Sequence, residues 1–305
     1  MKILVATEKP FSAAAVAQIK QIVEEGGVQF AALEKYTEKQ QLLEAVKDVD
    51  GIIVRSDIID AEVMDAAKNL KIVVRAGAGY DNIDLEAATA HKVVVMNTPG
   101  QNANAVAELV FGMVLFVIRN HFSGKAGSEL LGKKLGLQAF GNVARNVARV
   151  AKGFGMEVYA YDPFLTKEQI EAAGAKAVDS LEELYKTCQY VSLHCPATKE
   201  TIGSINYDLV KNLPKNGVLI NTARKEVIDE AGLEKLLEER EDLRYIADVK
   251  PNAADEFAAK FGDRVFFTPK KSGAQTAEAN ANAGVAAAHQ SVGFLKNGID
   301  KFRVN

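Results

Sequence analysis

Residues 133–163 read KKLGLQAFGNVARNVARVAKGFGMEVYAYDP, and this stretch decides the fold. Its apolar run Leu135–Ala139 predicts a strand, and the residues after it place apolar side chains at helical spacing. A second apolar run then leads into Asp162. The order strand, turn, helix and strand is typical of a βαβ unit in a parallel sheet.

The turn in this stretch reads Ala139-x-Gly141-x-x-Ala144, where a dinucleotide-binding fingerprint has three glycines. Gly141 keeps the position at which the backbone approaches a pyrophosphate, and the N-terminus of the following helix attracts that anion. Ala144 adds one methyl group where helix and strand meet. Ala139 is the larger departure, because the tight turn prefers glycine.

Asp162 closes the second strand at roughly the 20-residue separation expected of a ribose-binding acid. Its carboxylate suits the ribose hydroxyl groups of an adenosine and would repel a 2′-phosphate. We therefore expect NAD as the cofactor, and not NADP. The alternative is an α/β domain that binds no nucleotide, in which Asp162 only caps a turn.

The same alternation of short β-branched runs and helical patterns extends over the whole chain. The first series of expected strands is Lys2–Thr7, Val28–Leu33, Gly51–Arg55, Lys71–Arg75 and Val93–Met96. The second series is Lys133–Ala139, Glu157–Tyr161, Tyr190–Cys195, Gly217–Asn221, Tyr245–Val249 and Val265–Thr268. Two series predict two doubly wound parallel sheets, so the fold class is α/β.

Two longer helical patterns, Asn102–Asn120 and about Ala274–Leu295, lie at the joins between the two series. We expect the second sheet to be inserted into the first domain, with the last helix returning to that domain. The expected boundaries are residues 1–99 with 286–305 for the first domain, and residues 100–285 for the inserted one.

The composition is that of an ordinary globular protein of 305 residues, with 48% hydrophobic and 25% charged residues. A net charge of -3 gives no reason to expect nucleic acid. The most apolar run, Leu109–Ile118, covers about half of the ~20 residues that a membrane span needs. With no recognisable signal peptide and only Cys188 and Cys195, we expect a cytoplasmic protein without disulfide bonds.

Several motifs, in order and over nearly the whole chain, resemble the D-2-hydroxyacid dehydrogenases. They are Arg75-Ala-Gly-Ala-Gly-Tyr-Asp-Asn-Ile-Asp84, Asn97-Thr-Pro-Gly-Gln-Asn102, Val106-Ala-Glu-Leu109, Ser192-Leu-His-Cys-Pro196, Asn221-Thr-Ala-Arg224 and Ala247-Asp-Val249. The resemblance implies a Rossmann NAD-binding domain inserted into a flavodoxin-like substrate-binding domain. Within this family, an arginine at the position of Arg75 is typical of the branch that oxidises D-3-phosphoglycerate. The chain resembles the short form of that branch, which has no regulatory domain.

The resemblance also implies site residues. Those for the substrate are Arg55, Ser56, Arg75, Ala76 and Gly77. Those for the cofactor are Phe140, Gly141, Asn142, Val143, Asp162, His194, Thr222, Ala223 and Asp248. No metal is implied. The backbone amides of the Ala76–Gly79 turn are candidate carboxylate donors, and Lys9 is either a third substrate cation or a solvated loop residue.

Arg224 directly follows an expected strand, where open α/β sheets place their ligands. Its guanidinium group could hold a carboxylate in a bidentate fork. The alternative is an ion pair with a surface acid. Asp248 ends another expected strand, and its alternative role is to cap a helix.

The acid/base residue departs from the family pattern, in which a histidine is usual. Counting forward from Pro269 puts that position on Lys270, whereas counting back from Gly273 puts it on Lys271. We prefer Lys270, because the strand and the proline fix the start of the loop. Some short phosphoglycerate dehydrogenases carry lysine here, and this chain resembles them.

The glutamate that orients the family histidine is missing as well, since its position falls on Ala253. Asp255 or Glu256 could replace it only if the loop is rearranged. A lysine needs no such partner: without a nearby carboxylate, and with Arg224 close, its neutral form is favoured and can accept a proton.

These features together predict hydride transfer between D-3-phosphoglycerate and NAD, giving 3-phosphohydroxypyruvate for serine biosynthesis. One alternative is a reductase of glyoxylate or hydroxypyruvate. The other is a catalytically silent NAD-binding redox sensor. We expect a small phosphorylated substrate, no nucleic-acid or membrane partner and, from the resemblance, a homodimer.

Overall fold

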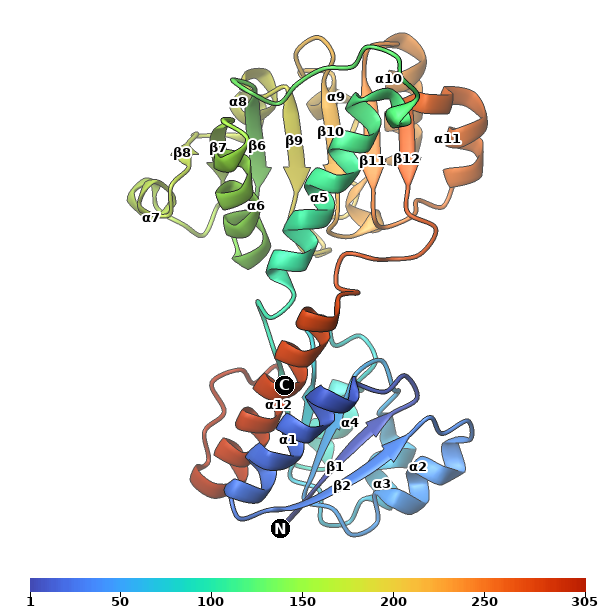
Figure 1. Ribbon diagram of the computed structural model, residues 1–305, viewed down its shortest axis with the longest axis vertical. Helices are drawn as coiled ribbons and strands as arrows, with labels where there is room; N and C mark the ends of the chain where they lie inside the picture. The colour runs from blue at the N-terminus through green and yellow to red at the C-terminus, as the bar shows by residue number, and fades with distance from the viewer. The chain divides into compact units, whose positions relative to one another are not determined.

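The computed structural model describes residues 1–305, which form two compact units (Figure 1). Unit 1 comprises Met1–Asn102 and Thr276–Asn305, and unit 2 comprises Ala103–Gln275. The return to unit 1 lies earlier than the 285/286 boundary taken from the sequence. The physical reason is that α12 (Ala277–Asn297) is one continuous helix, which begins with Thr276 as its N-cap.

Unit 1 is built on a five-stranded sheet in which every strand pair is parallel. The strands are β1 (Lys2–Thr7), β2 (Gln29–Glu34), β3 (Gly51–Val54), β4 (Ile72–Arg75) and β5 (Val94–Asn97). Their order is β2-β1-β3-β4-β5. This is the flavodoxin-like order, whose direction reverses between β1 and β3.

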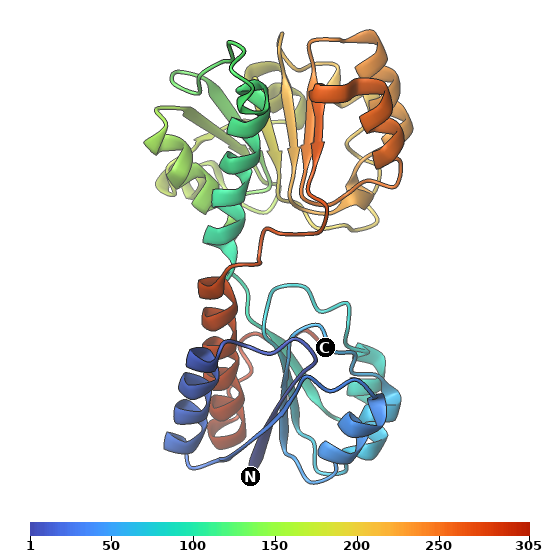
Figure 2. The same ribbon diagram turned by 45° about the vertical axis from the view of Figure 1, so that its right-hand side comes forward.

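Helices cover both faces of this sheet. They are α1 (Ala13–Glu25), α2 (Lys39–Ala45), α3 (Ala61–Ala66), α4 (Leu85–Ala90) and α12. One buried cluster joins α1 and α12 to the sheet, and another joins α2, α3 and α4 to its opposite face. The helices α1 and α12 lie side by side in both views (Figures 1 and 2). Small residues permit this contact: a Cβ at Gly284 would lie 2.7 Å from the Ile19 side chain.

Unit 2 is built on a seven-stranded sheet, again parallel throughout. The strands are β6 (Lys134–Gln138), β7 (Glu157–Tyr161), β8 (Lys176–Ala177), β9 (Tyr190–Leu193), β10 (Val218–Asn221), β11 (Arg244–Ala247) and β12 (Val265–Phe267). Their order is β12-β11-β10-β9-β6-β7-β8. This extends the Rossmann order, which reverses between β6 and β9.

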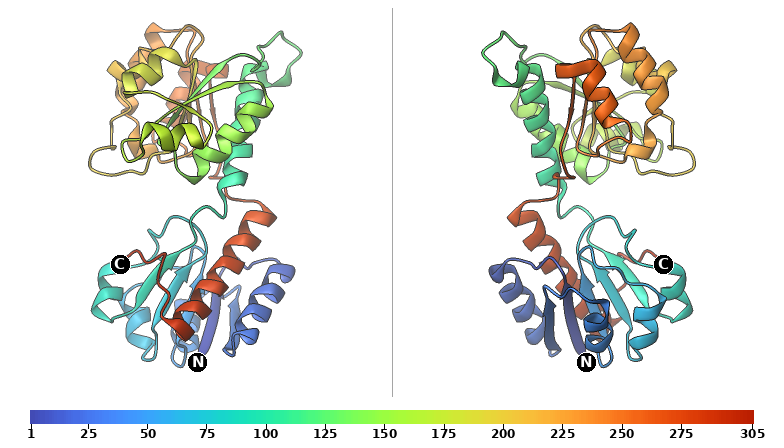
Figure 3. Two further views of the ribbon diagram at one scale, coloured as in Figure 1. Left: turned by 90° about the vertical axis from the view of Figure 1, so that its left-hand side faces the viewer. Right: turned by 90° about the vertical axis from the view of Figure 1, so that its right-hand side faces the viewer.

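The helices of unit 2 also lie on both faces of its sheet, as the side views show (Figure 3). They are α5 (Ala103–Ile118), α6 (Asn142–Gly153), α7 (Lys167–Ala172), α8 (Leu181–Thr187), α9 (Tyr207–Val210), α10 (Glu230–Glu239) and α11 (Ala254–Phe261). One apolar cluster joins α5, α6 and α7 to the sheet, and the other joins α8, α9, α10 and α11. No helix of the chain has both the length and the apolar character to cross a membrane.

The predicted fold class is confirmed: both sheets are parallel and doubly wound, and unit 2 is inserted into unit 1. The strand missing from the prediction is β8, which has only two residues and therefore no readable periodicity. In sheets of this kind, ligands bind outside the carboxyl ends of the strands at the reversal point. That rule directs attention to the residues after β6 and β9 in unit 2, and after β1 and β3 in unit 1.

Candidate active site

The turn after β6 has the backbone path that a glycine would give it, although it carries alanine. Ala139 has a φ of 67°, in the left-handed region that L-residues avoid. Its N–H donates to the Tyr161 carbonyl at 2.8 Å, which ties the turn to the end of β7. The departure at Ala139 therefore does not change the path of the turn, because the alanine adopts the left-handed conformation.

Gly141, which comes directly before α6, leaves room for a ligand. A Cβ built there would meet no atom within 4 Å, and no side chain caps the helix. The first-turn N–H groups at Asn142 and Val143 therefore face an open approach, as an anion site at a helix N-terminus requires. Ala144 is fully buried, so its methyl group fills the helix–strand contact.

Asp162 organises the loop that follows β7. Its Oδ2 accepts from the Phe140 N–H at 2.8 Å, and its Oδ1 accepts from the Phe164 N–H at 2.9 Å. The Phe140 side chain is completely buried, so this residue supports the turn and offers no surface to a ligand. Phe164, 93% exposed beside Asp162, is a flat apolar side chain that the sequence reading did not single out.

Two buried polar atoms near the carboxyl ends of β9 and β10 have no hydrogen-bond partner. They are Nε2 of His194 and Oγ1 of Thr222. Burial lowers the pKa of His194 to about 3, so its ring is neutral at ordinary pH. Buried polar groups are nearly always paired in native proteins, so unpartnered atoms after β9 and β10, at the carboxyl ends of the strands, are consistent with a site that a ligand completes. The residues present therefore fit a bound dinucleotide.

Arg224 follows β10 after a short, well-connected turn. Asn221 fixes this turn, because its side chain donates to the Arg224 carbonyl at 2.8 Å and accepts from the Ala223 N–H at 2.9 Å. The Arg224 guanidinium group makes one hydrogen bond within the protein, to the Ala223 carbonyl at 2.9 Å. Most of its five donors remain available for an anion.

Asp248 follows β11, and its carboxylate is 1% exposed. Oδ1 accepts from the Thr268 hydroxyl at 2.8 Å and from the Ser272 N–H at 2.7 Å, while Oδ2 accepts from the Gly273 N–H at 2.9 Å. Asp248 thus caps no helix, since Ala253 precedes α11. It shapes the loop that follows β12, a role that the sequence reading did not anticipate.

That loop carries Lys270 and Lys271, and both side chains are exposed. Because β10, β11 and β12 are neighbours, Arg224, Asp248 and the two lysines follow three adjacent strand ends. The structure therefore brings the predicted cation and the predicted base to one edge of the sheet.

Neither Asp255 nor Glu256 takes the place of the missing family glutamate beside Lys270. Asp255 pairs with Lys250 at 3.0 Å, and Glu256 pairs with Lys260 at 3.3 Å. Both acids lie in the first turn of α11, and neither contacts Lys270. The rearrangement that would bring one of them to Lys270 is not present.

In unit 1, Arg55 follows β3 at the reversal point, but much of its side chain holds the protein together. It donates to the carbonyl groups of Lys9 and Pro10 at 2.8 and 3.1 Å, and to Oδ1 of Asn280 at 2.6 Å. Its guanidinium group also lies over the Phe11 ring. Two donors remain for a substrate anion, so its structural role is at least as large as a binding one.

Arg75 is the last residue of β4, and its Nε donates to the Arg55 carbonyl at 3.0 Å. Its guanidinium group lies against Gly77, where any Cβ would overlap it, and Gly77 has a φ of 152°. Two of the candidate amide donors are already used, because the N–H of Ala76 donates to Val54 and that of Gly77 to Arg75. Only the later amides of the glycine-rich turn are open to a carboxylate.

Asp57 is a buried residue of this edge that the sequence reading missed. Its Oδ1 accepts from the Tyr36 hydroxyl at 2.8 Å and from the Glu8 N–H at 2.7 Å. Burial and the neighbouring Asp57 raise the pKa of Tyr36. Ser56 beside it is exposed. Only a pattern of alternating burial could have revealed Asp57, and the segment between β3 and α3 is too short to show one.

Residues 116–270 match the family model described as "D-isomer specific 2-hydroxyacid dehydrogenase, NAD binding domain". A solved 3-phosphoglycerate dehydrogenase of Entamoeba histolytica with bound NAD+ is 51% identical. The match covers 100% of this chain and 98% of that one, with a TM-score of 0.88.

Two curated relatives carry different names. D-3-phosphoglycerate dehydrogenase of Methanocaldococcus jannaschii is 35% identical over 88% of this chain and 54% of its own length. Hydroxypyruvate reductase of Thermotoga maritima is 37% identical over 82% of this chain and 86% of its own length. The chain spans about half the length of the curated phosphoglycerate dehydrogenases that it matches.

Proposed function

The chain belongs to the D-isomer-specific 2-hydroxyacid dehydrogenase family, and from this premise we propose that it oxidises D-3-phosphoglycerate at C2 with NAD. The observation that carries the proposal is the row of three adjacent strand ends in unit 2. It presents Arg224 with open donors, the buried carboxylate of Asp248, and a loop with two lysines.

The cofactor residues would be those around the turn after β6. The open N-terminus of α6 at Gly141 would hold the pyrophosphate, and Asp162 would accept hydrogen bonds from the adenosine ribose. Asp162 already binds two backbone N–H groups, and a carboxylate has lone pairs for two further donors. Phe164 would cover the adenine, because an aromatic side chain this exposed gains from stacking.

The chemistry asked of the protein is to hold an anion and to remove a proton. Arg224 would bind the substrate carboxylate, since its guanidinium group matches a planar pair of oxygens. The neutral Nζ of Lys270 or Lys271 would accept the C2 hydroxyl proton and, in reduction, return it. NAD, when bound, would take the hydride from C2. Asp248 would keep the lysine loop in place.

The phosphate group of the substrate would be bound by Arg75 in unit 1. A neutral substrate tail gives no reason for a cation at this strand end, whereas a phosphate does. Arg55 would contribute less, because three of its hydrogen bonds hold the loop after β1 and α12.

A reductase of hydroxypyruvate or glyoxylate is the second candidate, and the Thermotoga maritima relative favours it. A redox sensor without catalysis is the third, supported only by the loss of the family histidine and glutamate. One assay separates the three: NADH consumption with phosphohydroxypyruvate, hydroxypyruvate and glyoxylate. A preference for the phosphorylated substrate that Arg75→Ala abolishes would support the proposal, provided that Lys68→Ala, at an exposed lysine between α3 and β4, preserves it. Equal rates on all three would favour the second candidate, and no turnover would favour the third.

We further propose that the chain forms a homodimer and acts in the cytoplasm. Phe122 and Leu131, in the segment between α5 and β6, are 67% and 71% exposed, and large apolar side chains of this kind are common at subunit contacts. Cys188 and Cys195 are both buried thiols without a disulfide, as a reducing compartment favours. Sedimentation of wild type and of Phe122→Ser tests the dimer, which the variant should weaken.

A further inference from the structure

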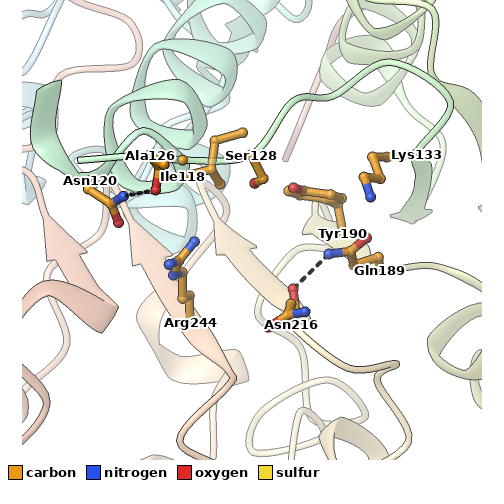
Figure 4. A pocket seen from close by; sticks show the side chains of 10 residues that line it. Ile118, Asn120, Ala126, Ser128, Lys133, Gln189, Tyr190, Asn216 and Arg244 are labelled. Atoms are coloured by element: carbon orange, nitrogen blue, oxygen red, sulfur yellow. Dashed lines mark hydrogen bonds between the residues drawn. The ribbon is translucent and has the colours of Figure 1, made fainter. Parts of the chain in front are cut away.

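A polar pocket lies at the amino ends of the strands of the unit 2 sheet, whereas the candidate active site lies at their carboxyl ends. It has a volume of about 250 Å³ and is lined by residues at the amino ends of the strands (Figure 4). Lys133 immediately precedes β6, Tyr190 begins β9, and Arg244 begins β11. The cofactor and catalytic residues follow the other ends of these strands, so this pocket has no part in the proposed reaction.

The pocket holds two cations and no acid. Lys133 and Arg244 are its only charged lining residues. Each is half-buried, and neither makes an ion pair or a side-chain hydrogen bond within the protein. A pocket that holds positive charge and no carboxylate favours an anion.

Hydroxyl groups lie beside these cations. Figure 4 shows Ser128 next to the ring of Tyr190, with Arg244 on the other side of the pocket. Burial raises the pKa of the Tyr190 phenol, while the Ser128 hydroxyl and the charge of Arg244 lower it. Arg244 is thus close enough to Tyr190 for its field to be felt there. Two hydroxyl donors and two cations form a donor set suited to a phosphate group.

The walls of the pocket are fixed in place by internal hydrogen bonds. The Asn120 side chain donates to the Ala126 carbonyl at 2.7 Å, and the Ser128 N–H donates to the Ile118 carbonyl at 3.0 Å. On the opposite wall, the Gln189 side chain donates to the Asn216 carbonyl at 3.0 Å. These bonds hold the cavity open without using either cation.

The loop that forms one wall is also conformationally unusual. Asn120, His121 and Phe122 all have left-handed backbone angles, with φ of 51°, 56° and 57°. A Cβ at Gly127 would lie 2.4 Å from the Ile118 carbonyl oxygen, so the path of the loop requires glycine at this position. Strained backbone of this kind persists where surrounding structure imposes it, and it gathers at ligand sites.

We propose that this pocket binds a small anion with a phosphate group, either inorganic phosphate or a phosphate monoester. Arg244 would take two phosphate oxygens in a fork, Lys133 would add a second charge, and the hydroxyls of Ser128 and Tyr190 would donate to the remaining oxygens. The volume lies just below the ~300–1,000 Å³ of sites for drug-sized ligands, which favours a ligand smaller than these.

The test is calorimetric titration of the full chain with inorganic phosphate, glycerol phosphate or malonate, in wild type and in three variants. Lys133→Met and Arg244→Met remove the charge and keep the apolar stem. Lys215→Met is the matched control, because Lys215 is an exposed lysine beside Asn216 that does not line the pocket. Phosphate that binds at the N-terminus of α6 gives the same signal in all four proteins and cancels in the comparison.

We expect one phosphate site that each pocket variant weakens about tenfold or more, since a hydrogen bond to a charged group is lost, while Lys215→Met retains it. Equal binding of inorganic phosphate and glycerol phosphate would identify the free ion as ligand, and a preference for glycerol phosphate would identify a monoester. Equal loss in all three variants, tight binding of malonate, or no site in wild type beyond the one shared with α6 would each overturn the proposal.

Discussion

The carboxylate of Asp248 accepts a hydrogen bond from the backbone N–H of Ser272 at 2.7 Å, and this contact joins the end of β11 to the loop after β12. The neighbouring Gly273 N–H donates to the other oxygen at 2.9 Å. A Cβ at Gly273 would lie 3.0 Å from that oxygen, so a larger residue would push the carboxylate away. One buried acid therefore sets the path of the loop that carries the proposed base.

Replacing Asp248 with asparagine should lower turnover without unfolding the protein. The amide nitrogen cannot accept a hydrogen bond, so one loop N–H loses a charged partner at a cost of about 1.5–3 kcal/mol. A loop displaced by that loss should reduce kcat by roughly 10- to 100-fold. Steady-state NADH kinetics and thermal unfolding of Asp248→Asn measure the two effects separately.

The matched control for this substitution is Asp255→Asn. The Asp255 side chain is 96% exposed and pairs only with Lys250, so its removal should leave kcat within about twofold of wild type. A wild-type kcat in Asp248→Asn would show that the loop does not depend on this carboxylate.

The lysine base makes a second prediction. Alanine at the residue that accepts the proton, Lys270 or Lys271, should lower kcat by roughly 10²- to 10⁴-fold, because general-base assistance is lost. The rate of oxidation in wild type should rise with pH, since only a neutral lysine can accept a proton. Lys250→Ala, an exposed lysine at the end of the neighbouring strand, serves as control. Wild-type rates in both single variants would exclude the lysine mechanism.

Much of this site was predictable because it depends on local pattern. The β-branched runs gave both sheets, and Gly141 and Asp162 marked the turn after β6 from their spacing alone. The position of Asp248 at a strand end was likewise readable. Its three partners lie 20 to 25 residues further along the chain, and no periodicity links such distant positions.

The sequence also could not show which arginine side chains already make hydrogen bonds within the protein. Arg55 was expected to face a substrate, yet it bonds to Asn280, 225 residues away. Only the return of α12 to unit 1 brings that partner close. The pocket at Lys133 and Arg244 was not predicted either, because its residues come from the starts of strands that lie far apart in the sequence.

A third prediction concerns the strained alanine in the turn after β6. Ala139→Gly should raise the free energy of unfolding by about 0.5–1 kcal/mol, because relief of the left-handed Cβ outweighs the added entropy of the unfolded chain. The control is Ala144→Gly in α6, where glycine should cost about 1 kcal/mol or more. Urea unfolding measures the change in the free energy of unfolding for both variants. A loss of stability in Ala139→Gly would show that Ala139 is not strained.

The neutral, buried ring of His194 predicts how stability depends on pH. Histidine in the unfolded chain has a pKa near 6.5, whereas burial lowers the pKa of His194 to about 3 in the folded protein. Between these values the unfolded chain binds a proton that the folded protein does not. Stability is therefore complete above about pH 6.5 and falls as the pH decreases towards 3.

This window gives the last measurement and its control. From pH 7.5 to pH 5 the free energy of unfolding should fall by about 2 kcal/mol through this residue, and His194→Gln should remove that part of the slope. His91 behaves in the opposite way, because its contact with Asp65 raises its pKa and stabilises the fold at low pH. The His91→Gln variant should therefore still lose stability between pH 7.5 and pH 5. An unchanged slope in His194→Gln, measured by urea unfolding at both pH values, would show that His194 takes up a proton in the folded protein.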